Sequence, residues 1–186
     1  MTKNYRTILG IDPGTNILGF GIVRIDSSQE PQFVDMGVLD LRRTESPYDK
    51  LHIISEKVAS LCDLHSPDDL AIESPFYGKN AQVVFKLGRA QGAAIAAALS
   101  RGVRVFEYAP RKVKMAVCGN GSASKEQVCV MLQKMFGTKI ENKFLDATDA
   151  LALAMCHFYQ LTNPLSSTEA ATSWEKFIAA NPDRVK

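Results

Sequence analysis

The order of apolar and polar positions in the first forty residues is typical of β-strands. Three runs rich in Ile, Val, Leu and Phe cover residues 7–12, 18–26 and 33–41. The turn-forming segments "PGTN" and "SSQEP" separate these runs. Because the runs are closely spaced, they predict three strands in an antiparallel meander.

The spacing of apolar positions then becomes helical. Ser46 followed by Pro47 is a typical helix start, and apolar residues recur on one face as far as His65. Next come an apolar strand at 68–73, a long helix at about 80–100 and a second strand at 104–108. Three further helical segments follow at 110–119, 124–137 and 146–161. This order predicts an α/β fold with a mixed five-stranded sheet flanked by helices.

The composition changes after about residue 161. The segment "TNPLSSTEAATS" is rich in Ser, Thr and Ala, which is typical of a linker. The following "SWEKFIAAN" has the spacing of a short helix. We therefore expect one globular domain over residues 1–162, and a linker with a short tail helix over 163–186.

Composition narrows the class of protein. The chain has 186 residues, of which 46% are hydrophobic, so it can form a substantial core. It contains neither a long apolar run nor a secretory pattern, and we expect a cytoplasmic protein. The four cysteines lack Cys-x-x-Cys spacing and predict free thiols rather than a zinc site or a redox pair.

The net charge of +2 conceals a strong segregation of charge along the chain. Residues 73–125 contain nine basic and two acidic residues, whereas the remainder contains thirteen basic and eighteen acidic residues. A basic middle segment of this kind favours binding of a polyanion such as nucleic acid. A solvated helix face would produce the same pattern, so charge alone does not decide the function.

Four carboxylates stand out by their surroundings. Asp12 and Glu73 each end an apolar strand, while Asp146 and Asp149 open the apolar helical segment "DATDALALAM", three positions apart on one face. Each acid alone has an ordinary explanation, as a loop cap or as a favourable charge at a helix start. If the first and fourth strands are neighbours and the last helix crosses their ends, however, the four acids converge.

A converging set of carboxylates requires cations, because a buried unpaired carboxylate costs several kcal/mol. The hard oxygen ligands suit Mg²⁺, and four acids suit a pair of ions bridging a phosphodiester. The sequence has no His/Cys cluster that would favour zinc.

Six ordered segments of the sequence resemble the RuvC family of Holliday-junction resolvases. They are "GIDPGT", "LAIESPF", "KLGRAQG", "FEYAPRKVK", "GNGSASKEQV" and "DATDALALA", and together they span roughly residues 7–160. "GIDPGT" alone is weak evidence, because a similar turn opens the actin/Hsp70 ATPase superfamily. The order and spacing of all six segments make the resemblance specific.

The resemblance implies an RNase H-like fold, a homodimer and Mg²⁺-dependent nicking of four-way DNA junctions, with Mn²⁺ as a substitute cation. It also implies a branch-migration motor, RuvA–RuvB, as a protein partner. The family's catalytic acids fall on Asp12, Glu73, Asp146 and Asp149, which would also be the metal ligands. The family motifs do not cover the tail beyond about residue 162.

We expect the DNA contacts to lie just after the fourth strand and at two helix starts, at Phe76, Arg111, Lys112, Lys114, Ser122, Ser124 and Lys125. A cationic helix start can bind phosphates. The resemblance places family DNA-contacting lysines at Lys114 and Lys125, and an aromatic that stacks on an unpaired base at Phe76. The alternatives are a core role for Phe76 and a solvated surface for Arg111 and Lys112.

The segment "GRAQGAAIAAALSRG" is rich in small residues. Its spacing favours tight packing on the sheet over a helix–helix dimer contact, and the resemblance then favours the dimer contact. Three other functions would explain part of the sequence. A junction-binding module without catalysis is one, and the four intact acids argue against it. An actin-like ATPase needs a second phosphate-binding domain, which this chain is too short to contain, whereas a related RNase H-like nuclease acting on hybrids or duplexes remains an alternative.

Overall fold

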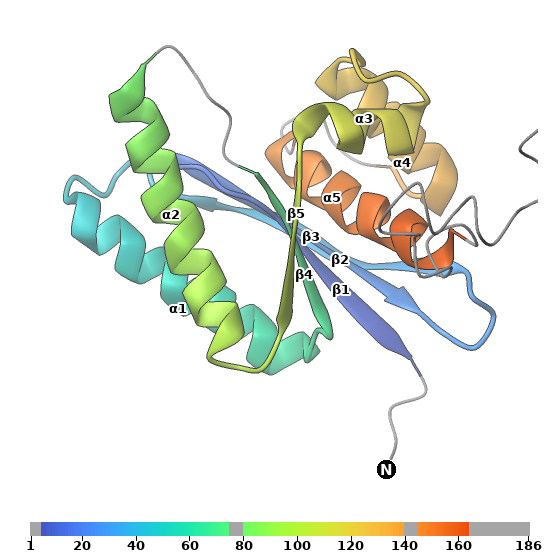
Figure 1. The fold of residues 1–186 in the computed structure, drawn as a ribbon, viewed down its shortest axis with the longest axis horizontal. Coiled ribbons are helices and arrows are strands. Elements are labelled where there is room, and N and C mark those ends of the chain that lie inside the picture. Colours follow the sequence, from blue (N-terminus) through green and yellow to red (C-terminus); the bar gives the residue numbers. More distant parts are fainter. Residues whose placement is uncertain (1–4, 75–79, 140–144, 164–186) are drawn as a thin grey trace, which may run out of the picture.

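The computed structural model describes residues 5–74, 80–139 and 145–163, and its centre is a five-stranded sheet (Figure 1). The strands are β1 (Arg6–Asp12), β2 (Ile17–Ile25), β3 (Pro31–Asp40), β4 (Asp69–Glu73) and β5 (Arg104–Tyr108), arranged in the order β3-β2-β1-β4-β5. The first three pair antiparallel, while β4 is parallel to β1 and to β5. The predicted meander and the predicted mixed sheet are both confirmed.

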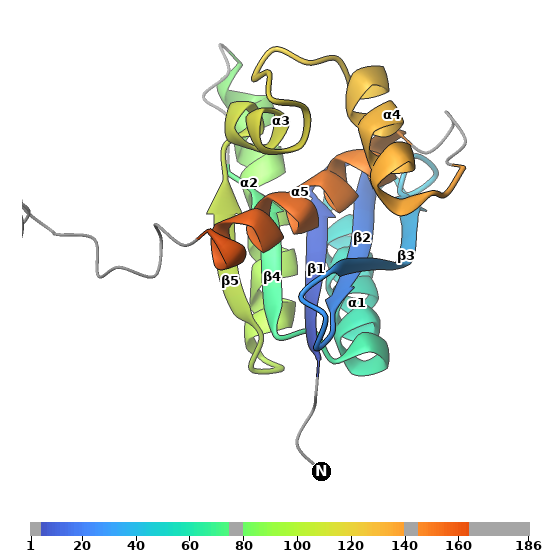
Figure 2. The ribbon, with the colours of Figure 1, turned by 90° about the vertical axis from the view of Figure 1, so that its right-hand side faces the viewer.

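Helices cover both faces of this sheet. On one face lie α1 (Pro47–His65) and α2 (Ala81–Leu99), and on the other lie α3 (Pro110–Cys118), α4 (Lys125–Phe136) and α5 (Leu145–Thr162) (Figure 1). Two clusters of buried apolar side chains fill the two interfaces. Figure 2 shows α5 crossing the sheet over β4, β1 and β2.

Local signals in the sequence account for most helix ends. The Ser46 side chain caps α1 by accepting a hydrogen bond from the Asp49 amide, and Pro47 is its first residue. Ser124 and Gln127 form a reciprocal capping box at the start of α4. Gly119 and Gly137 end α3 and α4 in the left-handed conformation, which glycine adopts without steric cost.

Strand boundaries differ from the prediction by one or two residues. The third strand was expected to begin at residue 33 but begins at Pro31, which pairs with Ile25. Proline is tolerated at the first position of a strand, and β3 is an edge strand with one unpaired side. The assignment of Pro31 to the turn before this strand was therefore wrong.

The expectation of tight packing for the small residues of α2 is only partly correct. The side chains of Ala90, Ala94 and Ala98 are fully buried against the core. A Cβ added at Gly88 or Gly92, in contrast, would meet no heavy atom within 4 Å. The alanines of this helix pack within the chain, and its glycines leave a face open.

Two further expectations concern the whole chain. All four cysteines are free, as predicted. Over residues 5–74, 80–139 and 145–163, no helix is long and apolar enough to cross a membrane. The proposed linker and tail helix lie outside the described residues, except for residue 163.

Candidate active site

The sheet brings the first two acids to the same edge. β1 and β4 are adjacent and parallel, with Ile11 opposite Ile72, so Asp12 and Glu73 follow at neighbouring strand ends. Both side chains line one cavity of about 260 Å³. The first condition for convergence of the acids, that the first and fourth strands are neighbours, is therefore met.

The start of α5 supplies the other two acids. Asp146 and Asp149 occupy its first turns, and carboxylate oxygens of Asp12, Asp146 and Asp149 all lie within 4.8 Å of one another. Asp149 lines the same cavity as Glu73. Four acids that are far apart in the sequence thus form one acidic cluster, consisting of Asp12, Glu73, Asp146 and Asp149.

Glycines in β1 and β2 allow this approach. A Cβ at Gly10 would overlap the carbonyl oxygen of Ala150, and one at Gly19 would overlap that of Asp146. A Cβ at Gly21 would lie 2.6 Å from the Cα of Leu151. The backbone of α5 therefore lies directly on the sheet, and any side chain at these positions would push the two aspartates away from Asp12.

The cluster is electrostatically unfavourable without a cation. Burial and the charges of Glu73 and Asp149 raise the pKa of Asp12 from 3.8 to about 7. Burial, followed by the charge of Asp149, also raises the pKa of Glu73, and burial raises that of Asp149. A site built only from carboxylate oxygens whose ionisation is suppressed fits a hard divalent cation.

Lys125 partly neutralises the cluster. Its Nζ lies 3.1 Å from Asp146 Oδ1 and 2.5 Å from Asp149 Oδ2. Burial alone would lower the pKa of Lys125, but the hydrogen bond and charge of Asp149 raise it above its ordinary value. Lys114 lines the same cavity from α3. Of the residues predicted to bind DNA, these two lysines thus lie beside the acids.

The remaining predicted DNA contacts lie farther out. Arg111 and Lys112 are exposed in the first turn of α3, and the Lys112 Nζ lies 5.2 Å from the centre of the Tyr108 ring. Ser122 is exposed in the loop before α4, whereas the Ser124 hydroxyl accepts the capping hydrogen bond from Gln127. Ser124 therefore has a structural role in addition to any contact with DNA. Phe76 lies outside the described residues.

Sequence reasoning missed the groups that support the acids. The buried Gln91 of α2 donates a hydrogen bond of 3.1 Å from Nε2 to the carbonyl oxygen of Glu73, which fixes the end of β4. Gln91 lies within the segment "KLGRAQG", and nothing in its spacing along the sequence indicates a tertiary partner. The glycines of β1 and β2 carried a weak signal, since glycine is unfavourable inside strands unless another backbone approaches.

A second buried polar group lies beneath α5. The Asp69 carboxylate is fully buried and pairs with Arg6 at 2.6 Å, with Arg104 at 2.7 Å and with His157 at 3.2 Å. Tyr108 Oη lies 2.6 Å from the other ring nitrogen of His157. His157 is buried in the core as part of this network.

Comparison with known proteins agrees with this arrangement. The family model for the crossover junction endodeoxyribonuclease RuvC matches residues 8–157. The curated RuvC of Bacteroides fragilis is 52% identical over 183 residues, which cover 97% of this chain and 96% of that protein. The RuvC of Porphyromonas gingivalis is 44% identical, with both chains covered completely.

Solved structures give the same result. The structure of Thermus thermophilus RuvC in complex with a Holliday junction substrate matches with a TM-score of 0.75 and 32% identity. The match covers 83% of this chain and 94% of that chain. Sequence and fold agree over nearly the whole length of these relatives, and the chain belongs to the RuvC family of crossover junction endodeoxyribonucleases.

Proposed function

We propose that this chain is a divalent-cation-dependent endonuclease that resolves four-way DNA junctions by paired, symmetric nicks in homologous recombination and DNA repair. The observation that carries the proposal is the acidic cluster, in which oxygens of Asp12, Asp146 and Asp149 lie within 4.8 Å of one another. Membership of the RuvC family supports the junction as substrate.

Mg²⁺ is the proposed cation, with two ions in each site and Mn²⁺ as a substitute. Ions held there would supply Lewis-acid polarisation of the scissile phosphodiester and would lower the pKa of the attacking water. The family resemblance implies a nick with a 5′-phosphate. Asp12 contributes ligands from the centre of the cluster, and Glu73, Asp146 and Asp149 complete the set. This assignment follows from the donor chemistry of the cavity and from the raised pKa of Asp12.

Lys125 and Lys114 supply the positive charge of the site. Lys125 reduces the repulsion between Asp146 and Asp149, which keeps both carboxylates together before a cation arrives. Both lysines line the cavity and carry charge that attracts the DNA phosphate. Lys125 is close enough to the acids to stabilise negative charge that develops on the reacting phosphate.

The proposed function also includes an oligomeric state and a place in the cell. Paired nicks require two active sites, and a homodimer related by a twofold axis provides them. The exposed Val83 and Phe85 of α2, together with the open face at Gly88 and Gly92, make this helix the candidate contact between subunits. We further propose a cytoplasmic enzyme that acts with the branch-migration motor RuvA–RuvB.

One assay tests the proposal. The protein is incubated with a four-way junction, a linear duplex and an RNA–DNA hybrid of matched sequence, with and without Mg²⁺. We expect paired nicks placed symmetrically in the junction, only when Mg²⁺ is present. Preferential cutting of the hybrid or the duplex would instead indicate a related RNase H-like nuclease with another substrate.

A further inference from the structure

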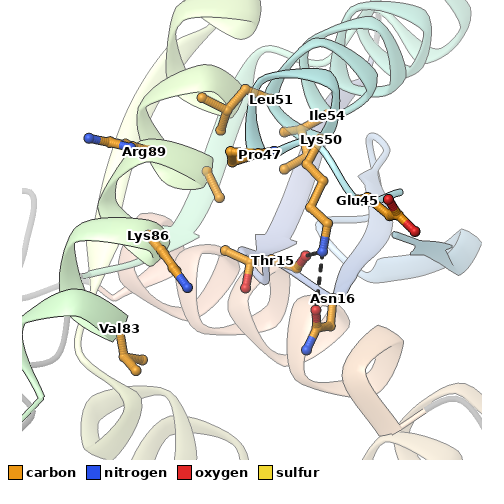
Figure 3. Close-up of a pocket in the computed structure, with 11 residues that line it drawn as sticks. Thr15, Asn16, Glu45, Pro47, Lys50, Leu51, Ile54, Val83, Lys86 and Arg89 are labelled. Carbon is orange, nitrogen blue, oxygen red and sulfur yellow. Dashed lines mark hydrogen bonds between the residues drawn. The ribbon is translucent and has the colours of Figure 1, made fainter. Parts of the chain in front are cut away.

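A second cavity lies on the opposite face of the sheet from α5. It has a volume of about 490 Å³ and lies between the first half of α1, α2 and the turn after β1 (Figure 3). We call it the α1–α2 pocket and define it by Thr15, Lys50, Leu51, Lys86 and Arg89. It shares no lining residue with the cavity of the acidic cluster.

The pocket is positively charged. Lys50, Lys86 and Arg89 line it, against a single acid, Glu45. Figure 3 shows the amines of Lys50 and Lys86 pointing toward the turn that carries Thr15. The Lys50 amine donates to the Thr15 carbonyl oxygen at 2.8 Å and to Asn16 Oδ1 at 3.3 Å, both neutral groups. Among the described residues, Lys50 therefore forms hydrogen bonds but no ion pair.

Lys86 and Arg89 have no ion pair with any residue in the part of the chain that the structure describes. Both side chains are exposed, one helical turn apart on α2. Unpaired cations on one side of a hollow attract an anion, and guanidinium and ammonium groups are the usual partners of phosphate.

The wall of the pocket is apolar. Pro47 and Leu51 of α1 form its accessible part, and the fully buried Ile54 and Ala90 lie behind them. A small inorganic anion would not need such a wall, whereas a sugar or a base would lie against it. The volume of about 490 Å³ is also in the range of small-molecule sites. The combination of cations and an apolar wall fits a nucleotide.

The pocket lies close to the acidic cluster. Thr15 is three residues after Asp12, so their Cα atoms are separated by at most about 11 Å. The turn 13–16 divides the two cavities at the same edge of the sheet. A DNA strand whose phosphate lies at the acids can therefore reach the pocket within a few nucleotides.

We propose that the α1–α2 pocket binds one nucleotide, with its phosphate at Lys86 and Arg89 and its sugar or base on Pro47 and Leu51. The proposed source is the DNA strand under cleavage, and this source rests on the proposed junction-cutting function. The alternative ligand with the same chemical groups is a free mononucleotide. A nucleotide bound in this pocket would hold the strand in register with the acids.

The test uses the full chain and the double variant Lys86→Ala/Arg89→Ala. The control is Lys134→Ala, which removes one exposed positive charge on α4, away from both cavities. Binding to a four-way junction, to dAMP and to inorganic phosphate is measured at several salt concentrations in the presence of Ca²⁺ to prevent cutting. Thermal unfolding of each variant checks that the substitutions leave the fold intact.

We expect the double variant to bind the junction at least about tenfold more weakly, because two charge-assisted contacts are lost. The slope of log affinity against log salt should become shallower by about two. The Lys134→Ala control should leave the affinity for the junction and the salt slope almost unchanged, because it removes only one distant charge. Weaker binding of dAMP with unchanged binding of the junction would support the pocket but identify a free nucleotide as its ligand.

Unchanged binding of both the junction and dAMP in the double variant would overturn the proposal. Equal binding of phosphate and dAMP by the wild-type protein would overturn the role of the apolar wall. If the wild-type protein cuts junctions while the double variant binds dAMP normally and also binds and cuts junctions normally, the pocket proposal fails and the proposed function stands. If the wild-type protein does not cut junctions, the proposed function fails separately.

Discussion

Asp12 and Asp69 lie on neighbouring parallel strands, and both carboxylates face α5, yet their environments are opposite. Asp69 is the more deeply buried, but its pKa is lowered to about 2, because His157 and Arg6 outweigh the effect of burial. Asp12 is half-buried, and burial together with three neighbouring acids raises its pKa to about 7.

The difference between the two aspartates separates a structural site from a functional one. The chain itself supplies the cations for Asp69, in Arg6 and Arg104. Around Asp12 it supplies further acids and two lysines, Lys114 and Lys125, of which Lys125 pairs with Asp146 and Asp149 rather than with Asp12. The compensation for Asp12 has to come from outside the chain.

The largest effect is expected from Asp12→Asn. Removing this carboxylate should lower the rate of junction cutting by about 10²–10³-fold or more, because a central ligand and its charge are lost. Binding of the junction should be unchanged or tighter, since a negative charge near the DNA is removed. Nicking of a labelled junction and a gel-shift assay measure the two quantities. Normal cutting by this variant would show that the site is assigned wrongly.

Asp69→Asn should produce the opposite result. We expect the free energy of unfolding to fall by about 3 kcal/mol, at the lower end of the range for breaking a buried ion pair, because Arg104 is 60% exposed. The rate of cutting per folded molecule should change little. Urea unfolding measures the loss, and Asp63→Asn, which breaks the exposed pair with Arg101, is the matched control with a much smaller effect.

Gly19→Ala tests the contact that brings α5 to Asp12. The added methyl group would overlap the carbonyl oxygen of Asp146, and such overpacking costs about 1–3 kcal/mol. The rate of junction cutting should fall by more than the loss of folded protein explains, because a shift of α5 displaces Asp146. In the control Gly37→Ala, the methyl group meets the tip of the Phe20 ring, which can shift. Equal losses of cutting in both variants would argue against a role for the α5 contact in positioning the acids.

The pH dependence of stability should differ in sign for the two aspartates. In metal-free protein, folded Asp12 retains its proton between pH 3.8 and about 7 while the unfolded chain has lost it. This group alone therefore lowers stability with rising pH, with a slope approaching about 1.4 kcal/mol per pH unit. Asp69 stabilises above pH 3.8, and this contribution is lost as the pH falls toward about 2.

Urea unfolding with EDTA from pH 4 to 8, for the wild-type protein and Asp12→Asn, isolates the contribution of Asp12. The variant should have a shallower decline of stability than the wild-type protein over this range. Addition of Mg²⁺ at pH 7 should stabilise the wild-type protein more than the variant, because the cation binds only the folded site. Identical pH profiles for the two proteins would mean that Asp12 ionises normally.

Much of this architecture could be predicted from local patterns. Apolar alternation located the strands, and Ser46–Pro47 and the glycines after α3 and α4 marked helix ends. These signals act between residues a few positions apart, so the sequence expresses them directly. The four acids were identified for the same reason, since a polar residue at the end of an apolar run is visible without a structure.

The supporting interactions could not be predicted in the same way. Gln91 reaches a carbonyl group eighteen positions away, and Asp69 pairs with residues from β1, β5 and α5. Such partners depend on strand order and on the angle at which a helix crosses the sheet. No spacing rule along one chain contains that information.

The sequence by itself determined the strands, the helices, the four candidate acids and the family to which the chain is similar. Only the tertiary structure decided that Asp69 has three basic partners, whereas Asp12 forms no ion pair with any residue that the structure describes. It also decided that Lys50, Lys86 and Arg89 line one pocket. The physical reason is that the cost of a buried charge depends on which groups surround it in space, and adjacency in space is set by the packing of α5 and α2 on the sheet.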